Sequence, residues 1–313
     1  MIQIYKTVES FPAGARVVFI GDSITAGVNY CTRVAAHYKK YLPERKVVFH
    51  GAGISGGSCT SALLYYDAQI TPFSPTHATI MLGVNDSDRT ALTVTDPEAG
   101  QTRLDTAFER YCKQMHELLD RLAADGVEVT LCTPAPYAEF FVTGEEPLPG
   151  GYALIRRYAE QVRRVAGERG LGLIDFHSYL SERYLTEEIY NPDHVHPNEL
   201  GQYRMAECVL GSQGLDIDPY QPMEELKAAE PLLAEWNILS GKIAGLYAVE
   251  WMVVRNFALP TEEKLALVQS YIDDGRYNDN PYFRNITKLF MENKPREAEM
   301  LTRLDALREE MIR

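Results

Sequence analysis

The sequence predicts a doubly wound α/β domain with a parallel sheet, followed by an all-helical C-terminal extension. From the N-terminus on, short apolar runs alternate with longer helix-like stretches, which is the βαβ rhythm of a parallel sheet. Most of these runs are continuous rather than alternating, as expected for strands covered on both faces. Composition changes after Gly211, because all seven histidines and all five cysteines precede it and both tryptophans follow it. We therefore expect residues 1–212 to form the α/β domain and residues 213–313 the extension.

The sheet is expected to contain five strands joined by helices. The predicted strands are Val17–Ile20, Lys46–Phe49, Ala78–Leu82, Val127–Leu131 and Leu171–Ile174. The predicted helices are Cys31–Leu42, Ser58–Ile70, Thr102–Asp125 and Tyr152–Arg169, with a further helix after Asn198. Because sheets of this kind bind their ligands at the carboxyl ends of the strands, the residues that follow each strand are the candidates for chemistry.

The extension begins after Gln213–Pro222, whose Gly, Asp and Pro residues are typical of a linker. Its predicted helices are Leu232–Phe257, Thr261–Asp274, Pro281–Glu292 and Arg296–Ile312. The last of them carries an apolar stripe at helical spacing, formed by Met300, Leu304, Leu307 and Met311. We expect this stripe to pack against neighbouring helices or the α/β domain. The alternative is a dimerisation seam, which would make the extension the interface of a homo-oligomer.

Composition excludes several classes of protein. The 313-residue chain is 45% hydrophobic and 24% charged, which is ordinary for a soluble globular protein. The chain has 31 basic and 44 acidic residues, which gives a net charge of −13. Because the phosphate backbone of nucleic acid is bound by basic surfaces, nucleic acid is not an expected partner. The scattered cysteines form no CxxC pair, which excludes a disulfide scaffold and common zinc fingers. No apolar run approaches a membrane span and Met1–Ser10 lacks a signal-like core, so we expect a cytoplasmic protein without a membrane partner.

The first strand leads directly into the segment GDSITAG, residues 21–27. A serine at this point, Ser23, has its hydroxyl at the carboxyl edge of the sheet, where a helix dipole favours developing negative charge. The alternative is an ordinary helix-capping serine, for which GDS is a suitable sequence.

The second strand ends in a glycine-rich segment, GAGISGG, that allows three interpretations. Gly51, Gly53 and Gly56 match the GxGxxG dinucleotide fingerprint, but the acidic residue expected after the next strand is replaced by Met81–Gly83. Ser55 lies in a GxSxG pattern, although only two strands precede it, which is early for a nucleophile elbow. The third interpretation is a loop whose backbone N–H groups bind an oxyanion.

Polar residues also follow the third strand and occur on a loop near the end of the α/β domain. Asn85, in GVND, has a side-chain amide that can donate to an oxyanion, although Asn is also common in turns. In the segment NPDHVHPN, Asp193 lies three residues before His196 and can orient its imidazole for acyl-transfer chemistry. The rival interpretation is a metal site formed by Asp193, His194 and His196, but no HExxH helix or cysteine cluster supports it.

The order of these segments resembles the four blocks of the GDSL/SGNH hydrolases over about residues 15–210. The resemblance implies a flavodoxin-like three-layer α/β/α sandwich and carboxyl-ester hydrolysis without a cofactor or metal. It further implies that Ser23 is the nucleophile, His196 the general base and Asp193 its orienting partner. Ser23, Gly56 and Asn85 would form the oxyanion hole. Departures are Gly51, where the glycine block usually opens with Asn, and Gly57, where Asp is common.

The function that this resemblance implies is serine-dependent hydrolysis of small acyl esters, with acetylated carbohydrates as the leading substrate class. An acyltransferase, a lysophospholipase or a thioesterase on the same fold is the alternative. A non-catalytic binding or scaffold protein and an NAD-dependent enzyme are two further hypotheses. The NAD-dependent hypothesis depends on the glycine-rich segment alone.

Overall fold

The computed structural model describes residues 6–27, 29–140 and 145–313. It contains one all-parallel sheet of five strands in the order β2-β1-β3-β4-β5. The strands are β1 (Arg16–Gly21), β2 (Val48–Gly53), β3 (His77–Met81), β4 (Glu128–Cys132) and β5 (Gly172–Ile174). The predicted fold class is confirmed, because this is the flavodoxin-like strand order with helices on both faces. The first five residues of Met1–Ser10 lie outside the described residues.

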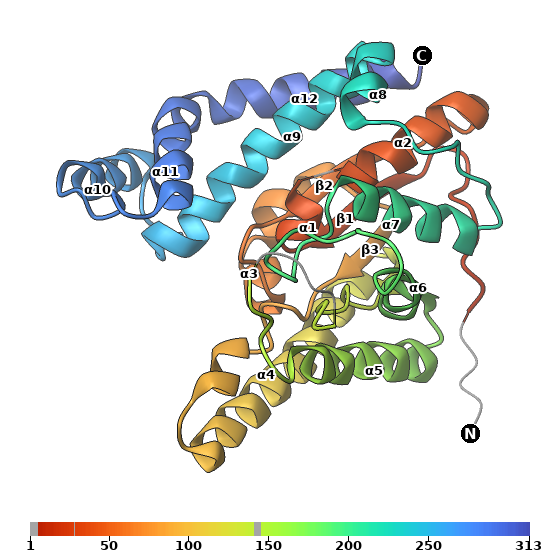
Figure 1. Ribbon diagram of the computed structural model, residues 1–313. Coiled ribbons are helices and arrows are strands. Elements are labelled where there is room, and N and C mark those ends of the chain that lie inside the picture. The colour runs from red at the N-terminus through yellow and green to blue at the C-terminus, as the bar shows by residue number, and fades with distance from the viewer. Residues whose placement is uncertain (1–5, 28, 141–144) are drawn as a thin grey trace.

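The two faces of the sheet are covered by different sets of helices (Figure 1). The apolar cluster on one face includes side chains from α2 (Asn29–Tyr41), α6 (Phe176–Arg183) and α7 (Glu199–Ser212). The cluster on the other face includes side chains from α3 (Cys59–Leu64), α4 (Pro97–Ala124) and α5 (Gly151–Arg169). Successive residues of β1 alternate between these two clusters, which explains why its sequence is continuously apolar.

The expected helices differ from the observed ones in several places. The segment predicted as one helix over Ser58–Ile70 is α3 followed by a π-helical turn, Tyr66–Ile70. Three short helices were not predicted: α1 (Ser23–Ala26), α6 and α8 (Met223–Ala229). β2 continues to Gly53, four residues beyond its predicted end, because its glycines and His50 carry no strand signal in the sequence although they are buried.

The helical extension lies against the face that carries α2 (Figure 1). It consists of α8, α9 (Pro231–Val249), α10 (Thr261–Asp273), α11 (Pro281–Asn293) and α12 (Glu297–Met311). The segment predicted as one helix over Leu232–Phe257 forms two elements: α9, which ends at Val249, and a π-helical turn, η5 (Glu250–Val254). In Figure 1, α9 and α12 lie side by side, and both contact the edge strand β2. No helix in the described ranges is long and apolar enough to cross a membrane.

The extension shares its hydrophobic core with the sheet. Trp236 from α9 and Leu304 from α12 are both fully buried in the same cluster as Phe19 and Phe49. Within the apolar stripe of α12, Met300, Leu304 and Leu307 are buried and Met311 packs against the cluster. The stripe therefore packs within the chain, whereas oligomerisation and the division at residue 212 stay predictions.

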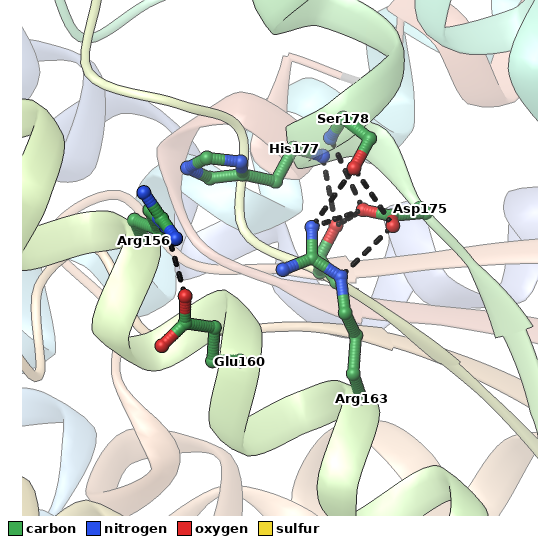
Figure 2. A network of polar contacts seen from close by, with 7 residues as sticks. Arg156, Glu160, Arg163, Asp175, His177 and Ser178 are labelled. Atoms are coloured by element: carbon green, nitrogen blue, oxygen red, sulfur yellow. Dashed lines mark hydrogen bonds and ion pairs between the residues drawn. The ribbon is translucent and has the colours of Figure 1, made fainter. Parts of the chain in front are cut away.

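A polar network fixes the point where the loops after β4 and β5 leave the sheet (Figure 2). Arg163 donates to both carboxylate oxygens of Asp175 over 2.9 Å, and Thr133 donates to Asp175 Oδ1 over 2.9 Å. Asp175 also caps α6 by accepting from the Ser178 N–H over 3.1 Å. Burial alone would raise the pKa of Asp175, but these hydrogen bonds outweigh it and lower the pKa. The carboxylate of Asp175 thus joins Arg163 of α5, the start of α6 and Thr133 after β4.

Because the extension and the sheet share one core, we predict that Leu304→Ala destabilises the whole protein. Loss of a fully buried leucine costs about 2–5 kcal/mol. Urea unfolding followed by circular dichroism and tryptophan fluorescence should shift to a lower midpoint in one common transition. The control is Leu289→Ala in α11, where the leucine is 44% exposed and the cost should stay below about 1 kcal/mol. Two separate transitions would contradict the shared core.

Candidate active site

Ser23, the glycine segment and Asn85 follow strand ends that lie next to one another in the sheet, whereas Asp193 and His196 lie in the loop between α6 and α7. In the register of the sheet, Gly21 at the end of β1 pairs with Gly53 of β2 and with Met81 of β3. Ser23 and Asn85 therefore leave the sheet at the same edge as the glycine segment. This edge is where the chemistry of a doubly wound fold is expected.

Ser23 is the first residue of the four-residue helix α1, and Asp22 is its N-cap. The carboxylate of Asp22 accepts the Ile24 N–H over 2.9 Å. The capping role is therefore taken by Asp22, and the alternative interpretation of Ser23 as an ordinary cap is wrong. The Thr25 and Ala26 N–H groups donate to the carbonyl of Asp22 over 3.1 and 2.9 Å, which leaves the Ser23 N–H as the donor that α1 can offer at this edge.

Two glycines allow α1 to lie directly on the strand ends. A Cβ at Gly21 would lie 2.2 Å from Oγ1 of Thr25, and a Cβ at Gly53 would lie 2.3 Å from the backbone nitrogen of Ala26. Both distances are far below van der Waals contact. Gly53 therefore serves helix packing within β2, and it does not belong to a phosphate-binding loop as the dinucleotide fingerprint would require.

Ser23, His196 and Asp193 form a continuous hydrogen-bonded chain. Oγ of Ser23 lies 2.7 Å from Nε2 of His196, and Nδ1 of His196 lies 2.5 Å from Oδ2 of Asp193. The side chains of His196 and Asp193 are each 38% exposed, so the chain is open to solvent at this edge. Burial would raise the pKa of Asp193, but hydrogen bonds from the His196 side chain and from backbone N–H groups lower it to about 2. The carboxylate is therefore ionised at neutral pH.

The loop that carries this pair is held by its own backbone. The second carboxylate oxygen of Asp193, Oδ1, accepts the N–H groups of Val195 and His196, each over 3.0 Å. Tyr190 and Pro197 form an antiparallel bridge that closes the loop, and the Asn191 N–H donates to the His196 carbonyl over 2.9 Å. The imidazole is thus positioned by the fold of the loop, a few residues before α7 begins.

His194 points away from this chain. Its backbone adopts a φ of 61°, and its ring nitrogens lie 2.9 Å from the carbonyl of Ala138 and 2.7 Å from the carbonyl of Glu145. The ring is buried and fastens the histidine loop to the segment after β4. This geometry does not bring His194 together with Asp193 and His196 in the way the rival metal interpretation requires.

The glycine segment forms a tight turn beside the serine. The Gly57 N–H donates to the Ile54 carbonyl over 2.8 Å, and Gly56 adopts a φ of 71°, which glycine accommodates without strain. Asn85 reaches this turn, because its Nδ2 donates to the Gly57 carbonyl over 3.0 Å. An amide carries two N–H groups, so Asn85 retains one for a ligand. Ser55 lies in the same turn, whereas His196 Nε2 contacts Ser23.

Residues 19–204 of the chain match the GDSL-like Lipase/Acylhydrolase family. The protein belongs to this family. The match covers more than half of the chain and contains all the predicted site residues, so the predicted resemblance is confirmed. The protein is accordingly a GDSL-type carboxylic ester hydrolase. No curated protein matches it.

Solved structures extend the similarity beyond the family core. A structure described as BT4096, a gut microbial diltiazem-metabolizing enzyme, has a TM-score of 0.79 at 14% identity and covers 98% of this chain and 96% of its own. A catalytic mutant of Axe2, an acetylxylan esterase from Geobacillus stearothermophilus, has a TM-score of 0.56 at 20% identity. That match covers 67% of this chain and 99% of Axe2. At these identities the similarity shows the fold, and of these two matches the first also spans the extension.

Sequence analysis of the esterase missed a cluster of charged residues next to the serine. Asp22 and Asp86 are both buried, and in each the Oδ2 atom has no hydrogen-bond partner. Burial raises the pKa of Asp22 to about 6, and burial together with the charge of Asp22 raises the pKa of Asp86 to about 7. Nearby Arg89 lowers the pKa of Asp22 in part. The sequence could have indicated these two aspartates, because Asp22 directly precedes Ser23 in GDS and Asp86 directly follows Asn85 in GVND.

The raised pKa of Asp86 predicts a particular pH dependence of stability. A carboxyl group whose pKa is higher in the folded state contributes stability that is full below the unfolded pKa of 3.8 and is lost as pH rises towards about 7. Asp86→Asn has no group that titrates at this position, so its free energy of unfolding should not fall for this reason as the pH rises. Between pH 5 and pH 8 the variant should therefore become more stable relative to the wild type, by about a few kcal/mol. Urea midpoints measured at four pH values give this slope. The exposed Asp279→Asn variant is the charge-matched control, and parallel slopes for Asp86→Asn and wild type would contradict the prediction.

Proposed function

We propose that the esterase cleaves small acyl esters through Ser23, His196 and Asp193. The observation that carries this proposal is the unbroken chain from Ser23 Oγ to His196 Nε2, over 2.7 Å, and from His196 Nδ1 to Asp193 Oδ2, over 2.5 Å. A serine hydroxyl is a weak nucleophile until a base removes its proton. Here the base is within reach of the hydroxyl, and an ionised carboxylate holds the imidazole in the tautomer that can accept that proton.

In the proposed reaction, Oγ of Ser23 attacks the acyl carbon while its proton passes to Nε2 of His196. The carbonyl oxygen becomes an oxyanion, which accepts hydrogen bonds from the backbone N–H groups of Ser23 and Gly56 and from Nδ2 of Asn85. The C–O bond to the leaving alcohol then breaks, and the alcohol takes the proton from His196. Water, activated by the same imidazole, releases the acid from the acyl-serine and restores the hydroxyl.

The proposed substrate is an acetyl ester, with acetylated carbohydrates as the leading class. Support comes from the similarity to Axe2, which is described as an acetylxylan esterase. A transferase, a lysophospholipase or a thioesterase would use the same residues. The acyl acceptor and the acyl chain distinguish these possibilities, because only a transferase passes the acyl group to an added alcohol in preference to water.

The first test compares p-nitrophenyl acetate, butyrate and octanoate as substrates of the wild type and of Ser23→Ala. We expect the acetate to be hydrolysed fastest and Ser23→Ala to lose essentially all activity, because the hydroxyl that contacts the imidazole is that of Ser23. Ser55→Ala is the matched control and should retain most of the activity. Activity that survives in Ser23→Ala and disappears in Ser55→Ala would assign the nucleophile to the glycine turn. Preference for octanoate would point to lipids or thioesters.

The second test is Asp193→Asn, which should keep the fold and lower kcat by up to about 10⁴-fold. Two backbone N–H groups donate to Oδ1, so the amide oxygen of the variant should occupy that position. The amide NH₂ then faces Nδ1 of His196 and stabilises the tautomer whose Nε2 carries a proton and cannot accept one from Ser23. Thermal melting verifies the fold, and Asp279→Asn is the control. Unchanged kcat would show that another group orients the imidazole.

A further inference from the structure

The extension contacts the turn that carries the proposed oxyanion donor. Nε1 of Trp251 donates to the carbonyl oxygen of Gly56 over 2.8 Å. The neighbouring side chain packs on the same residue, because a Cβ at Gly56 would lie 2.9 Å from Sδ of Met252. Both side chains belong to η5, the π-helical turn at the end of α9. Single π-turns of this kind occur frequently at functional sites.

The turn needs such support because glycine gives it little conformational restriction. Gly56 has a φ of 71°, and the residue that follows it is also a glycine. The Gly56 N–H belongs to the peptide between Ser55 and Gly56, and rotation of that peptide would turn the N–H away from the ester. Three contacts hold the backbone next to that peptide: the hydrogen bond from the Gly57 N–H to the Ile54 carbonyl, the Asn85 amide on the Gly57 carbonyl, and the Trp251 indole on the Gly56 carbonyl.

Trp251 is itself held on two sides. Its ring stacks on that of Phe257, with ring centroids 6.4 Å apart and an interplanar angle of 7°. The Phe257 ring in turn packs edge-to-face with Tyr65, and their ring centroids are 4.3 Å apart. The preceding residue, Glu250, is buried and pairs with Lys264 over 2.8 Å and with Lys294 over 2.6 Å. Charges buried in this way specify one arrangement, because any shift of η5 would separate them without water to replace the lost partner.

We propose that Trp251 is a positioning residue for the oxyanion hole, and hence that the helical extension completes the ester site. The indole N–H fixes the Gly56 carbonyl, which holds the turn so that the Gly56 N–H faces the developing oxyanion. This inference rests on the proposed function, since it assigns a role to a donor of that reaction. A hydrogen bond that strengthens the oxyanion hole acts on the transition state more than on bound substrate, so its loss should appear in kcat.

The other tryptophan of the chain supplies a control. Nε1 of Trp236, in the preceding helix α9, is buried without a hydrogen-bond partner. The substitutions Trp251→Phe and Trp236→Phe therefore both remove an indole N–H, but only the first removes a hydrogen bond to the turn. With p-nitrophenyl acetate, Trp251→Phe should lower kcat at least about tenfold, below the 10²–10³-fold loss for removing a donor outright, and leave KM within about twofold. Trp236→Phe should change neither constant by more than about twofold.

A boronic acid inhibitor provides the second readout. Its tetrahedral adduct with the serine places an oxygen in the oxyanion hole, so Trp251→Phe should weaken inhibition by the same factor as kcat/KM. A role in stability alone would lower the melting temperature and leave both quantities unchanged. Equal kcat values for Trp251→Phe and Trp236→Phe would overturn the proposal. Residual activity in Ser23→Ala would instead overturn the proposed function, whatever the result at Trp251.

If Trp251→Phe does not fold, an isosteric replacement gives the same test. Growth of a tryptophan auxotroph on 3-benzothienylalanine in the Trp236→Phe background replaces only Trp251 and exchanges the N–H for sulfur without changing the ring shape. The expected result is the same loss of kcat at an unchanged melting temperature. A folded protein with the kcat of the Trp236→Phe parent would overturn the proposal.

Discussion

The whole site depends on how closely the short helix α1 approaches the ends of β1 and β2. Gly21 and Gly53 face each other in the register of the sheet, and a side chain at either position would collide with α1. Their absence of side chains allows Ser23 to begin a helix directly on the edge of the sheet. From there its hydroxyl reaches the imidazole of His196, which lies 173 positions later in the chain. A single additional methyl group at this contact would move the serine relative to every other group of the site.

The histidine loop is organised before any substrate binds. Asp193 uses one carboxylate oxygen to hold the backbone of its own loop and the other to hold the imidazole of His196. His194, with its left-handed backbone, fastens the same loop to the carbonyl of Ala138. The entropy of orienting the His196 imidazole is therefore lost during folding, so in the proposed reaction the base is already in place, which is the main advantage of a preorganised site. Asn198 then caps α7 and ties the loop to the α/β core.

The sequence was sufficient to predict the features that depend on local pattern. All five strands were recognised from apolar runs, and Ser23, His196 and Asp193, which the structure joins by hydrogen bonds, were selected from two short motifs. The end of β2 was misjudged because its last residues, including Gly53, are buried by the approach of α1 and not by their own hydrophobicity. The π-helical turns were not predictable, since tertiary contacts set them. The buried charge of Asp86 likewise depends on neighbours that no short segment reveals.

The extension shows why a family core can be incomplete as a description of a site. β2 is one of the two edge strands of the sheet, and α9 and α12 pack against it, which is one way to protect an exposed edge. The carboxyl end of the same strand leads into the glycine turn, and the end of α9 continues into η5 beside that turn. Trp251 reaches Gly56 across 195 positions of sequence as a consequence of this packing. The apolar faces that dock the extension and the indole that contacts the turn therefore belong to one arrangement, in which the helices that protect an edge strand also contact the glycine turn.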